Sequence, residues 1–207
     1  MPRLRQVPRS ETQDETIIGM YNVIFQDRDP VSDPGTATGT PGNWWTVFAL
    51  VPDIFQHAVQ GFGLYASPSR LLDPLLRELG QLRAGWNCRS QFVFSQHCKE
   101  ARELGISEAK ISAIPGWGVS EQFSPIERAV LAYTDALAFD RGRVDDAVFA
   151  ALQEHLTDEQ ILELTYITSL YILHANMCNA LRLEYDDVPE RVIEIGGGTL
   201  GDISFHS

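Results

Sequence analysis

The 207-residue chain has few cysteines, and no two of them are separated by two residues. Cys88, Cys98 and Cys178 form no Cys-x-x-Cys motif, and three cysteines cannot all pair within one chain. We therefore expect reduced thiols, as in a reducing compartment. Spacings typical of zinc ligands, such as H-E-x-x-H, and the G-x-S-x-G nucleophile elbow are also missing. The sequence predicts no metal site and no cofactor.

Positive charge is scarce as well. The chain has 16 Lys and Arg against 28 Asp and Glu, a formal net charge of −12. Because such a chain repels phosphate backbones, we expect no nucleic-acid partner. Arg3, Arg5 and Arg9 lie near the start of the chain, and we interpret them as a solvated arm. No run of about eighteen apolar residues is present, and the first residues lack the apolar core of a secretion signal. These absences predict no membrane segment and a cytoplasmic location.

Strand patterns are nearly absent. Alternation with a period of two occurs convincingly only at 192–195. The glycines that follow, from Gly196 to Gly201, fit G-x-G-x-x-G, but six further residues are too few for the helix and strand of a dinucleotide site. The rest of the chain has helical spacing and predicts an all-α fold. Predicted helices cover 14–28, two short pieces of 44–65 divided at Pro52, 69–86, 88–104, a short helix from Ser107 that ends before Pro115, 125–139, 144–156 and 158–184.

The chain divides into three predicted parts. Residues 1–66 form an N-terminal arm with helices that cover the core, 67–184 form the main helical domain, and 185–207 form a tail. Residues 29–42, rich in Pro, Gly and Thr, form a loop that is long for a compact domain and is therefore functional or mobile. Two capping boxes, Ser124 with Glu127 and Thr157 with Gln160, mark the starts of helices in the main domain.

Glu78 is the first candidate site residue. Leucines at i−7, i−3 and i+4 place it on a predicted apolar stripe; they are Leu71, Leu75 and Leu82. A carboxylate there needs a partner, because desolvation of a charge is costly. We expect Arg77 and Arg83 to face elsewhere. The spacing leaves two interpretations open, a structural ion pair and a functional acid.

His97 is the second candidate. Seven residues after Ser90 and three after Phe94, it shares a predicted helix face with both. Its imidazole titrates near neutrality and can exchange protons, although a hydrogen-bonded core histidine has the same pattern. His174 lies in a seam with Leu164, Ile167, Tyr171, Cys178 and Leu181, which indicates a helix packed in the core or against another subunit. If Cys88 and Cys98 share one helix, they lie about 15 Å apart, too far for a disulfide.

An ordered set of these segments between residues 70 and 184 resembles the carboxymuconolactone decarboxylase and AhpD-like family. The set comprises Arg77-Glu78-Leu79-x-x-Leu82-Arg83, Ser90 to His97, Ala101 to Ser107 with Ile111 and Ile114, Glu127 to Asp135, and Leu162 to Asn179. The resemblance implies an AhpD-like helical fold and a homotrimer or homohexamer.

The peroxidase branch of that family carries Glu, then Cys-x-x-Cys, then His. The resemblance places these roles at Glu78 and His97, and it places the two cysteine positions at Ser90 and Val93. Without sulfur there, the disulfide cycle of that branch cannot run, and hydroperoxide reductase activity is disfavoured. Decarboxylase-type members have a carboxylate near position 93, where this chain has Val93, and Gln91 is neutral.

The resulting hypothesis is a cofactor-independent lyase, or a related acid–base enzyme, for a small carbonyl, lactone or carboxylate substrate. His97 would transfer the proton, Glu78 would orient and tune it, and Ser90 would bind a substrate oxygen. Aromatic residues would line the substrate site; they are Phe94, Trp86 and Trp45. Two alternatives remain, a non-catalytic oligomeric binding protein and a peroxidase-like enzyme that uses Cys88 or Cys98.

Overall fold

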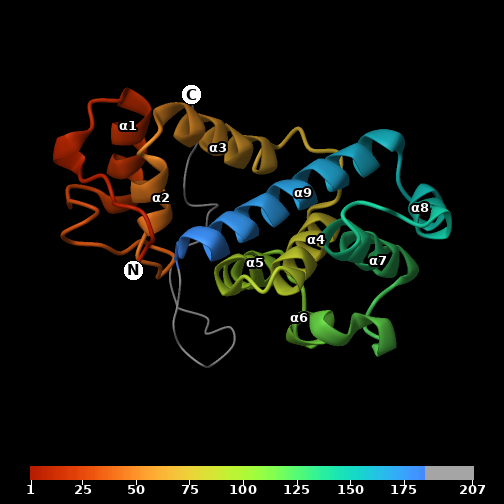
Figure 1. The fold of residues 1–207 in the computed structure, drawn as a ribbon. Coiled ribbons are helices and arrows are strands. Elements are labelled where there is room, and N and C mark those ends of the chain that lie inside the picture. Colours follow the sequence, from red (N-terminus) through yellow and green to blue (C-terminus); the bar gives the residue numbers. More distant parts are fainter. Residues whose placement is uncertain (185–207) are drawn as a thin grey trace. The chain divides into compact units, whose positions relative to one another are not determined.

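The computed structural model describes residues 1–184, and the regular elements in that range are all helical (Figure 1). This confirms the all-α prediction; the run 192–195 and the glycines after it lie outside the described residues. Within 1–184 no helix is long and apolar enough to span a membrane. The helices are α1 (Glu15–Phe25), α2 (Asn43–Phe48), α3 (Pro52–Tyr65), α4 (Pro74–Asn87), α5 (Gln91–Glu103), α6 (Glu108–Ala113), α7 (Pro125–Phe139), α8 (Asp146–Gln153) and α9 (Asp158–Leu181), with 3-10 helices η1 (Arg9–Glu11) and η2 (Ile114–Val119).

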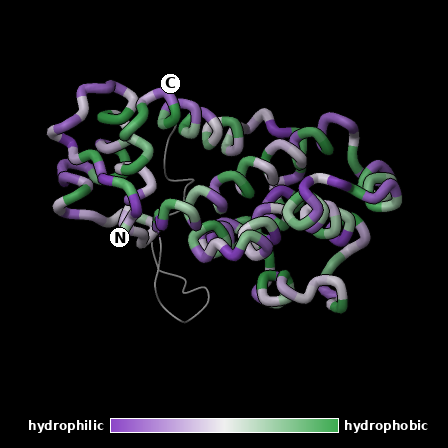
Figure 2. Tube along the Cα trace, in the orientation of Figure 1, coloured by the Kyte–Doolittle hydropathy of each residue, from purple (hydrophilic) through white to green (hydrophobic). Residues whose placement is uncertain are grey.

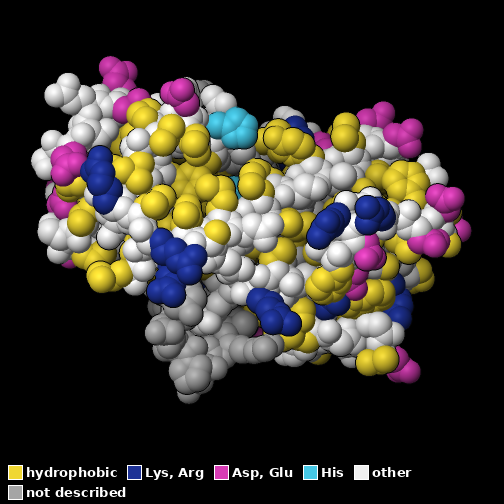
Figure 3. Space-filling model, in the orientation of Figure 1, with side chains coloured by type: hydrophobic (Ala, Val, Ile, Leu, Met, Phe, Trp, Pro, Cys, Tyr) yellow, Lys and Arg dark blue, Asp and Glu magenta, His cyan; other side chains and the backbone are white. Residues whose placement is uncertain are grey.

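The described chain forms two compact units. Residues 1–68 and 177–184 belong to the first unit, and residues 69–176 form the second. The end of α9 therefore belongs to the first unit and the rest of α9 to the second. In both units, hydrophobic and hydrophilic residues recur along the helices, as expected for helices with one buried face (Figure 2). On the face seen in Figure 3, Lys and Arg side chains lie in separate small groups.

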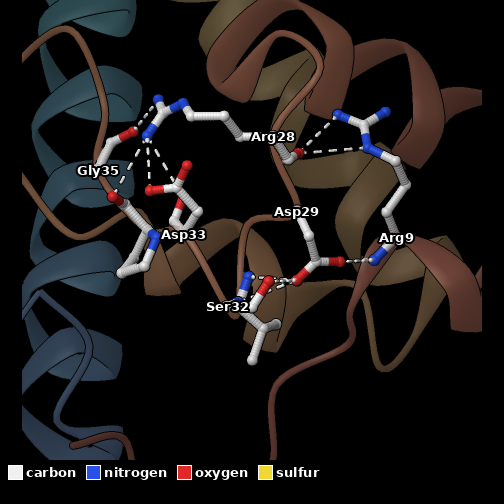
Figure 4. Close-up of polar contacts among 8 residues, drawn as sticks. Arg9, Arg28, Asp29, Ser32, Asp33 and Gly35 are labelled. Atoms are coloured by element: carbon white, nitrogen blue, oxygen red, sulfur yellow. Dashed lines mark hydrogen bonds and ion pairs between the residues drawn. The ribbon is translucent and has the colours of Figure 1, made fainter.

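In the first unit, polar contacts hold the N-terminal segment and the loop after α1. Arg9 donates to Asn22 Oδ1 at 2.5 Å and to the carbonyl of Arg28, so its interpretation as a solvated residue was wrong. Asp29 accepts hydrogen bonds from the backbone N–H groups of Arg9 and Ser32 (Figure 4). Burial alone would raise the pKa of Asp29, but backbone hydrogen bonds from Ser32 and Arg9 outweigh it and lower that pKa. The start of the predicted functional or mobile loop, 29–42, is therefore fastened to the N-terminal segment.

In the second unit, α4 packs against both α5 and α7. Gly85 permits the close approach of α4 to α5. A Cβ at Gly85 would lie 2.8 Å from the backbone nitrogen of Phe94, closer than real Cβ atoms approach backbone. Any larger residue would push these helices apart. The core around α4 is formed mainly by buried aliphatic side chains, among them Leu72, Leu79, Leu82, Val130, Leu131, Leu152 and Leu164.

Several predicted helix ends were placed wrongly, and long-range contacts explain the clearest case. The helix predicted from residue 69 begins at Pro74, with Asp73 as its N-cap. The N–H groups of Leu71 and Leu72 are instead bound by Glu163 of α9, at 2.8 and 2.9 Å. The helices predicted over 14–28, 88–104, 144–156 and 158–184 are also shorter than expected. Two predictions of local structure are confirmed, the break at Pro52 and both capping boxes.

Asp135 of α7 connects three elements of the second unit. Its carboxylate accepts from Arg83 at 2.5 and 3.1 Å, from Asn87 at 2.8 Å and from the indole of Trp117 at 3.0 Å. Arg83 also donates to the carbonyl of Ile114 at 2.9 Å. Because these donors come from α4 and η2, the network fixes α4 in the position from which it presents Glu78.

Candidate active site

Glu78 of α4 and His97 of α5 are in direct contact inside the second unit. His97 Nδ1 lies 2.7 Å from Glu78 Oε2, and the side chains are 3% and 0% exposed. A carboxylate accepts hydrogen bonds, so this contact favours a proton on Nδ1 and assigns exchange with a substrate to Nε2. The geometry is that of an imidazole oriented by a buried acid.

The surroundings of Glu78 differ from the sequence prediction in two ways. Leu71 precedes α4 and is exposed, and Leu75 is exposed as well. The predicted apolar stripe is therefore wrong at these two leucines. Arg77 was expected to face elsewhere, yet its Nε lies 3.4 Å from Glu78 Oε1. Arg83 does face elsewhere and pairs with Asp135. Each oxygen of Glu78 thus has a charged or polar partner, as a fully buried carboxylate requires.

Two residues of α9 complete this side of the site. The ring of Tyr171 meets the imidazole of His97 edge to face, with centroids 4.4 Å apart. The ring of His174 lies 5.8 Å from that of Tyr171. Burial, together with the charge of His97, lowers the pKa of His174 from 6.5 to about 4, so His174 is neutral at pH 7. Burial raises the pKa of Tyr171 strongly, so its phenol keeps its proton and is neutral as well.

Glu100 was not singled out in the sequence, although it follows His97 by one turn of α5. Burial raises the pKa of Glu100, and the negative charge of Glu78 adds to this effect, while the charges of His97 and Arg77 oppose it. Glu100 therefore lies within electrostatic reach of the Glu78–His97 pair. Its spacing of i+3 from His97 was the available signal.

The remaining candidates of the second unit lie on the same two helices. Ser90 is the N-cap of α5 and accepts a hydrogen bond from the Val93 N–H at 3.3 Å. Its hydroxyl proton can still be donated to an acceptor, since a hydroxyl both donates and accepts. Trp86 and Phe94 pack edge to face, with centroids 5.6 Å apart, beside the core of the unit. They place aromatic surface at the ends of α4 and α5.

Trp45 belongs to the first unit. It is buried there against other aromatic rings, namely Trp44, Phe55 and Phe62. These contacts give Trp45 a place in the core of that unit. Its predicted contact with substrate stays a prediction.

The three cysteines form no disulfide within residues 1–184. Cys88 ends α4 whereas Cys98 lies within α5, so the assumption of a shared helix was wrong. Burial raises the pKa of Cys88, and it raises that of Cys178 to about 12. Cys98 is buried. Among residues 1–184, no group of three or more His, Cys, Asp or Glu side chains is arranged to hold a metal ion.

Part of the chain is similar to a known protein family. Residues 53–136, which include Glu78 and His97, match the model of the carboxymuconolactone decarboxylase family. The uncharacterized protein YnjA of Escherichia coli is 29% identical over 142 residues, 69% of this chain and 76% of YnjA. The uncharacterized protein YdfG of Bacillus subtilis is 28% identical over 92 residues, 44% of this chain and 63% of YdfG. The family-model match supports the predicted resemblance of this chain to the carboxymuconolactone decarboxylase and AhpD-like family.

Solved structures share the fold. ATU0492 of Agrobacterium tumefaciens, an AhpD-like protein of unknown function, is 25% identical with a TM-score of 0.57, over 65% of this chain and 92% of that one. A peroxidase-related protein of Ralstonia eutropha with an alkylhydroperoxidase AhpD core gives a TM-score of 0.69 at 19% identity, over 90% of this chain and 93% of that one. The debrominase Bmp8 in complex with 2,3,4-tribromopyrrole gives a TM-score of 0.65 at 17% identity, over 88% of this chain and 90% of that one. At these identities the last two indicate the fold and not the reaction.

Proposed function

We propose that the protein is a cofactor-independent acid–base enzyme, most simply a lyase, that moves a proton next to a carbonyl or lactone. The observation that carries the proposal is the buried contact of Glu78 with His97 at 2.7 Å. A paired acid and imidazole, withdrawn from water, is an arrangement that orients the imidazole for proton transfer. The fold alone assigns no reaction, since one fold hosts many chemistries.

In a decarboxylation, the bond between the substrate carbon and its carboxylate breaks, and CO₂ leaves. The electron pair stays on the substrate as an enolate, which His97 protonates from Nε2. Glu78 stabilises the imidazolium before the transfer, and solvent returns the proton afterwards. Ser90 donates its hydroxyl to the oxygen that gains negative charge. Phe94 and Trp86 supply apolar surface for the remainder of the substrate.

The thiol-based alternative is weaker. A reactive cysteine needs a lowered pKa and access to solvent. Burial instead raises the pKa of Cys88, and Cys98 is buried. A non-catalytic binding protein would have the same helices, and turnover separates it from an enzyme.

We also propose that the protein is a homo-oligomer, a trimer or a hexamer, as the family resemblance implied. The apolar seam of α9 gives no support, because residues such as Leu164 and Ile167 are buried within the chain itself. Three other residues along one side of α9 are exposed, by 67%, 49% and 49%; they are Leu162, Tyr166 and Leu173. Light scattering at micromolar concentration tests the proposal: a complex of three or six chains supports it, and a monomer contradicts it.

The test of the enzymatic proposal is a screen in D₂O. Small carboxylactones and β-keto acids are incubated with the protein, and NMR follows CO₂ release and deuterium uptake at the carbon next to the carbonyl. Any turnover found is expected to fall about 10²–10⁴-fold in His97→Ala, the range for loss of a positioned acid or base. His155→Ala is the matched control, because His155 is exposed in the second unit. Equal turnover of both variants would contradict the proposal.

A further inference from the structure

Two buried polar side chains of the second unit have no hydrogen-bond partner among residues 1–184. Gln81 is 0% exposed, and neither its Nε2 nor its Oε1 is bonded. Thr168 is 1% exposed, and its Oγ1 is likewise unbonded. Buried polar groups without partners are rare in native proteins and cost stability. Such groups need a partner, and a ligand that binds beside them can supply it.

Gln81 lies on α4, which carries Glu78, and Thr168 lies on α9, whose Tyr171 contacts His97. Gln81 follows Glu78 by one turn of α4, so the two share a side of that helix. Thr168 meets α4 directly, because a Cβ added at Gly80 would lie 3.1 Å from Thr168 Oγ1. One turn further along α9, the Tyr171 ring contacts His97.

Thr134 shows the ordinary arrangement for a buried threonine at the same place. It is 0% exposed and lies 3.6 Å from the position of a Cβ at Gly80, but its hydroxyl donates to the Val130 carbonyl at 2.9 Å. A threonine in a helix can satisfy its hydroxyl in this way. Thr168 makes no such hydrogen bond. Its hydroxyl is thus held ready for a different partner.

We propose that Gln81 and Thr168 bind the polar end of a small neutral ligand beside His97, a group with a carbonyl oxygen and an adjacent O–H or N–H. A protonated carboxyl, an enol and a primary amide have this pattern. The carboxamide of Gln81 donates from Nε2 to the carbonyl oxygen and accepts at Oε1 from the O–H or N–H, while Thr168 donates or accepts as needed. A carboxylate ligand fits less well, because the negative charge of Glu78, one turn of α4 away from Gln81, would repel it. The positive charge of Arg77 is already paired with Glu78. The statement that this ligand is a substrate rests on the proposed acid–base function; the binding site does not.

The site would determine specificity. When a ligand supplies the missing partners, the cost of three unbonded atoms is removed, and an analogue that lacks the O–H or N–H leaves one of them unbonded. Sites of this kind reject such analogues strongly, far more than an apolar pocket rejects a missing methylene.

A first experiment measures melting temperature without ligand. Gln81→Met and Thr168→Val remove unbonded atoms and keep the volume, so each is expected to raise Tm by roughly 2–4 °C. The matched controls are Thr134→Val and Gln160→Met, which remove bonded groups and are expected to lower it. A fall in Tm for both test variants, as large as in the controls, would overturn the proposal, because it would show that an internal water or another structural partner satisfies these atoms.

A second experiment measures binding with acetamide as the probe and acetone as its matched control, since acetone has the carbonyl but no N–H. NMR of the ¹⁵N-labelled protein follows the side-chain NH₂ signal of Gln81, assigned by its loss in Gln81→Met. Acetamide is expected to shift this signal saturably and at least tenfold more tightly than acetone, and Thr168→Val is expected to weaken binding. Absence of a shift, or equal binding of the two probes, would overturn the proposal. Neither experiment requires turnover. If His97→Ala abolishes turnover while Gln81→Met leaves it intact, the acid–base function stands and the statement that this ligand is the substrate falls.

Discussion

Replacement of Asp135 by Ala is expected to destabilise the second unit severely. The change removes the acceptor for Arg83, whose side chain is only 10% exposed, and for the indole of Trp117. Loss of one partner of a buried ion pair costs about 3–5 kcal/mol, because the remaining charge stays buried without compensation. The carbonyl of Ile114 still accepts from Arg83 and limits the loss.

The assay for Asp135→Ala is thermal unfolding followed by calorimetry, with urea unfolding as a second measure. A loss of about 3–5 kcal/mol corresponds to a fall in Tm of roughly 10 °C in a chain of this size. Glu108→Ala is the matched control. Glu108 also binds an arginine, Arg102, through two hydrogen bonds, but its side chain is 66% exposed, so its loss is expected to leave Tm nearly unchanged. A fall in Tm no larger for Asp135→Ala than for the control would refute the reasoning.

Three further predictions concern protonation. The pKa of His174 is about 4 in the folded protein and 6.5 in the unfolded chain, so unfolding takes up a proton between these two pH values. As pH falls from 6.5 to 4, the free energy of unfolding of the wild type should fall by up to about 3 kcal/mol relative to that of His174→Gln. Urea unfolding curves measure this difference. Asp29 has a lowered pKa in the folded protein, so its ionised form stabilises the fold at pH values above the pKa of about 4 in the unfolded chain. This stabilisation is lost as pH falls further. The difference in Tm between wild type and Asp29→Asn should therefore shrink in acid. Because burial raises the pKa of Cys88, its reaction with a thiol reagent at pH 7 should be slower in the folded than in the urea-unfolded protein, and a fast reaction would revive the thiol-based alternative.

Local signals in the sequence predicted much of the helical structure of both units. The capping box of Ser124 and Glu127 sets the start of α7, and Pro52 divides α2 from α3, because these effects depend on neighbours along the chain. The start of α4 shows the limit of prediction from such local signals. Ser67-Pro68 and Asp73-Pro74 are similar helix-start signals, and the contact of Glu163 with Leu71 and Leu72 accompanies the second. That contact joins residues about ninety positions apart, which periodicity cannot detect.

The candidate site was predictable as residues but not as an arrangement. The family resemblance placed Glu78 and His97 in one relay, whereas the leucine spacing gave Glu78 the wrong neighbours. Their contact depends on the close approach of α4 to α5 at Gly85, a property of tertiary packing. Gln81 had no signal at all, because a glutamine in a helix is ordinary until its burial is known.

The central claim is that Glu78 and His97 act as one catalytic unit. The most direct test is a double-mutant cycle of kcat on any substrate found in the D₂O screen, normalised to the folded fraction of each variant. Glu78→Gln and His97→Ala are each expected to lower kcat about 10²–10⁴-fold, and the double variant should be little worse than either, because members of one unit are not additive. If the variants lower Tm but leave kcat per folded molecule unchanged, the pair is a structural contact of the core and the claim is contradicted.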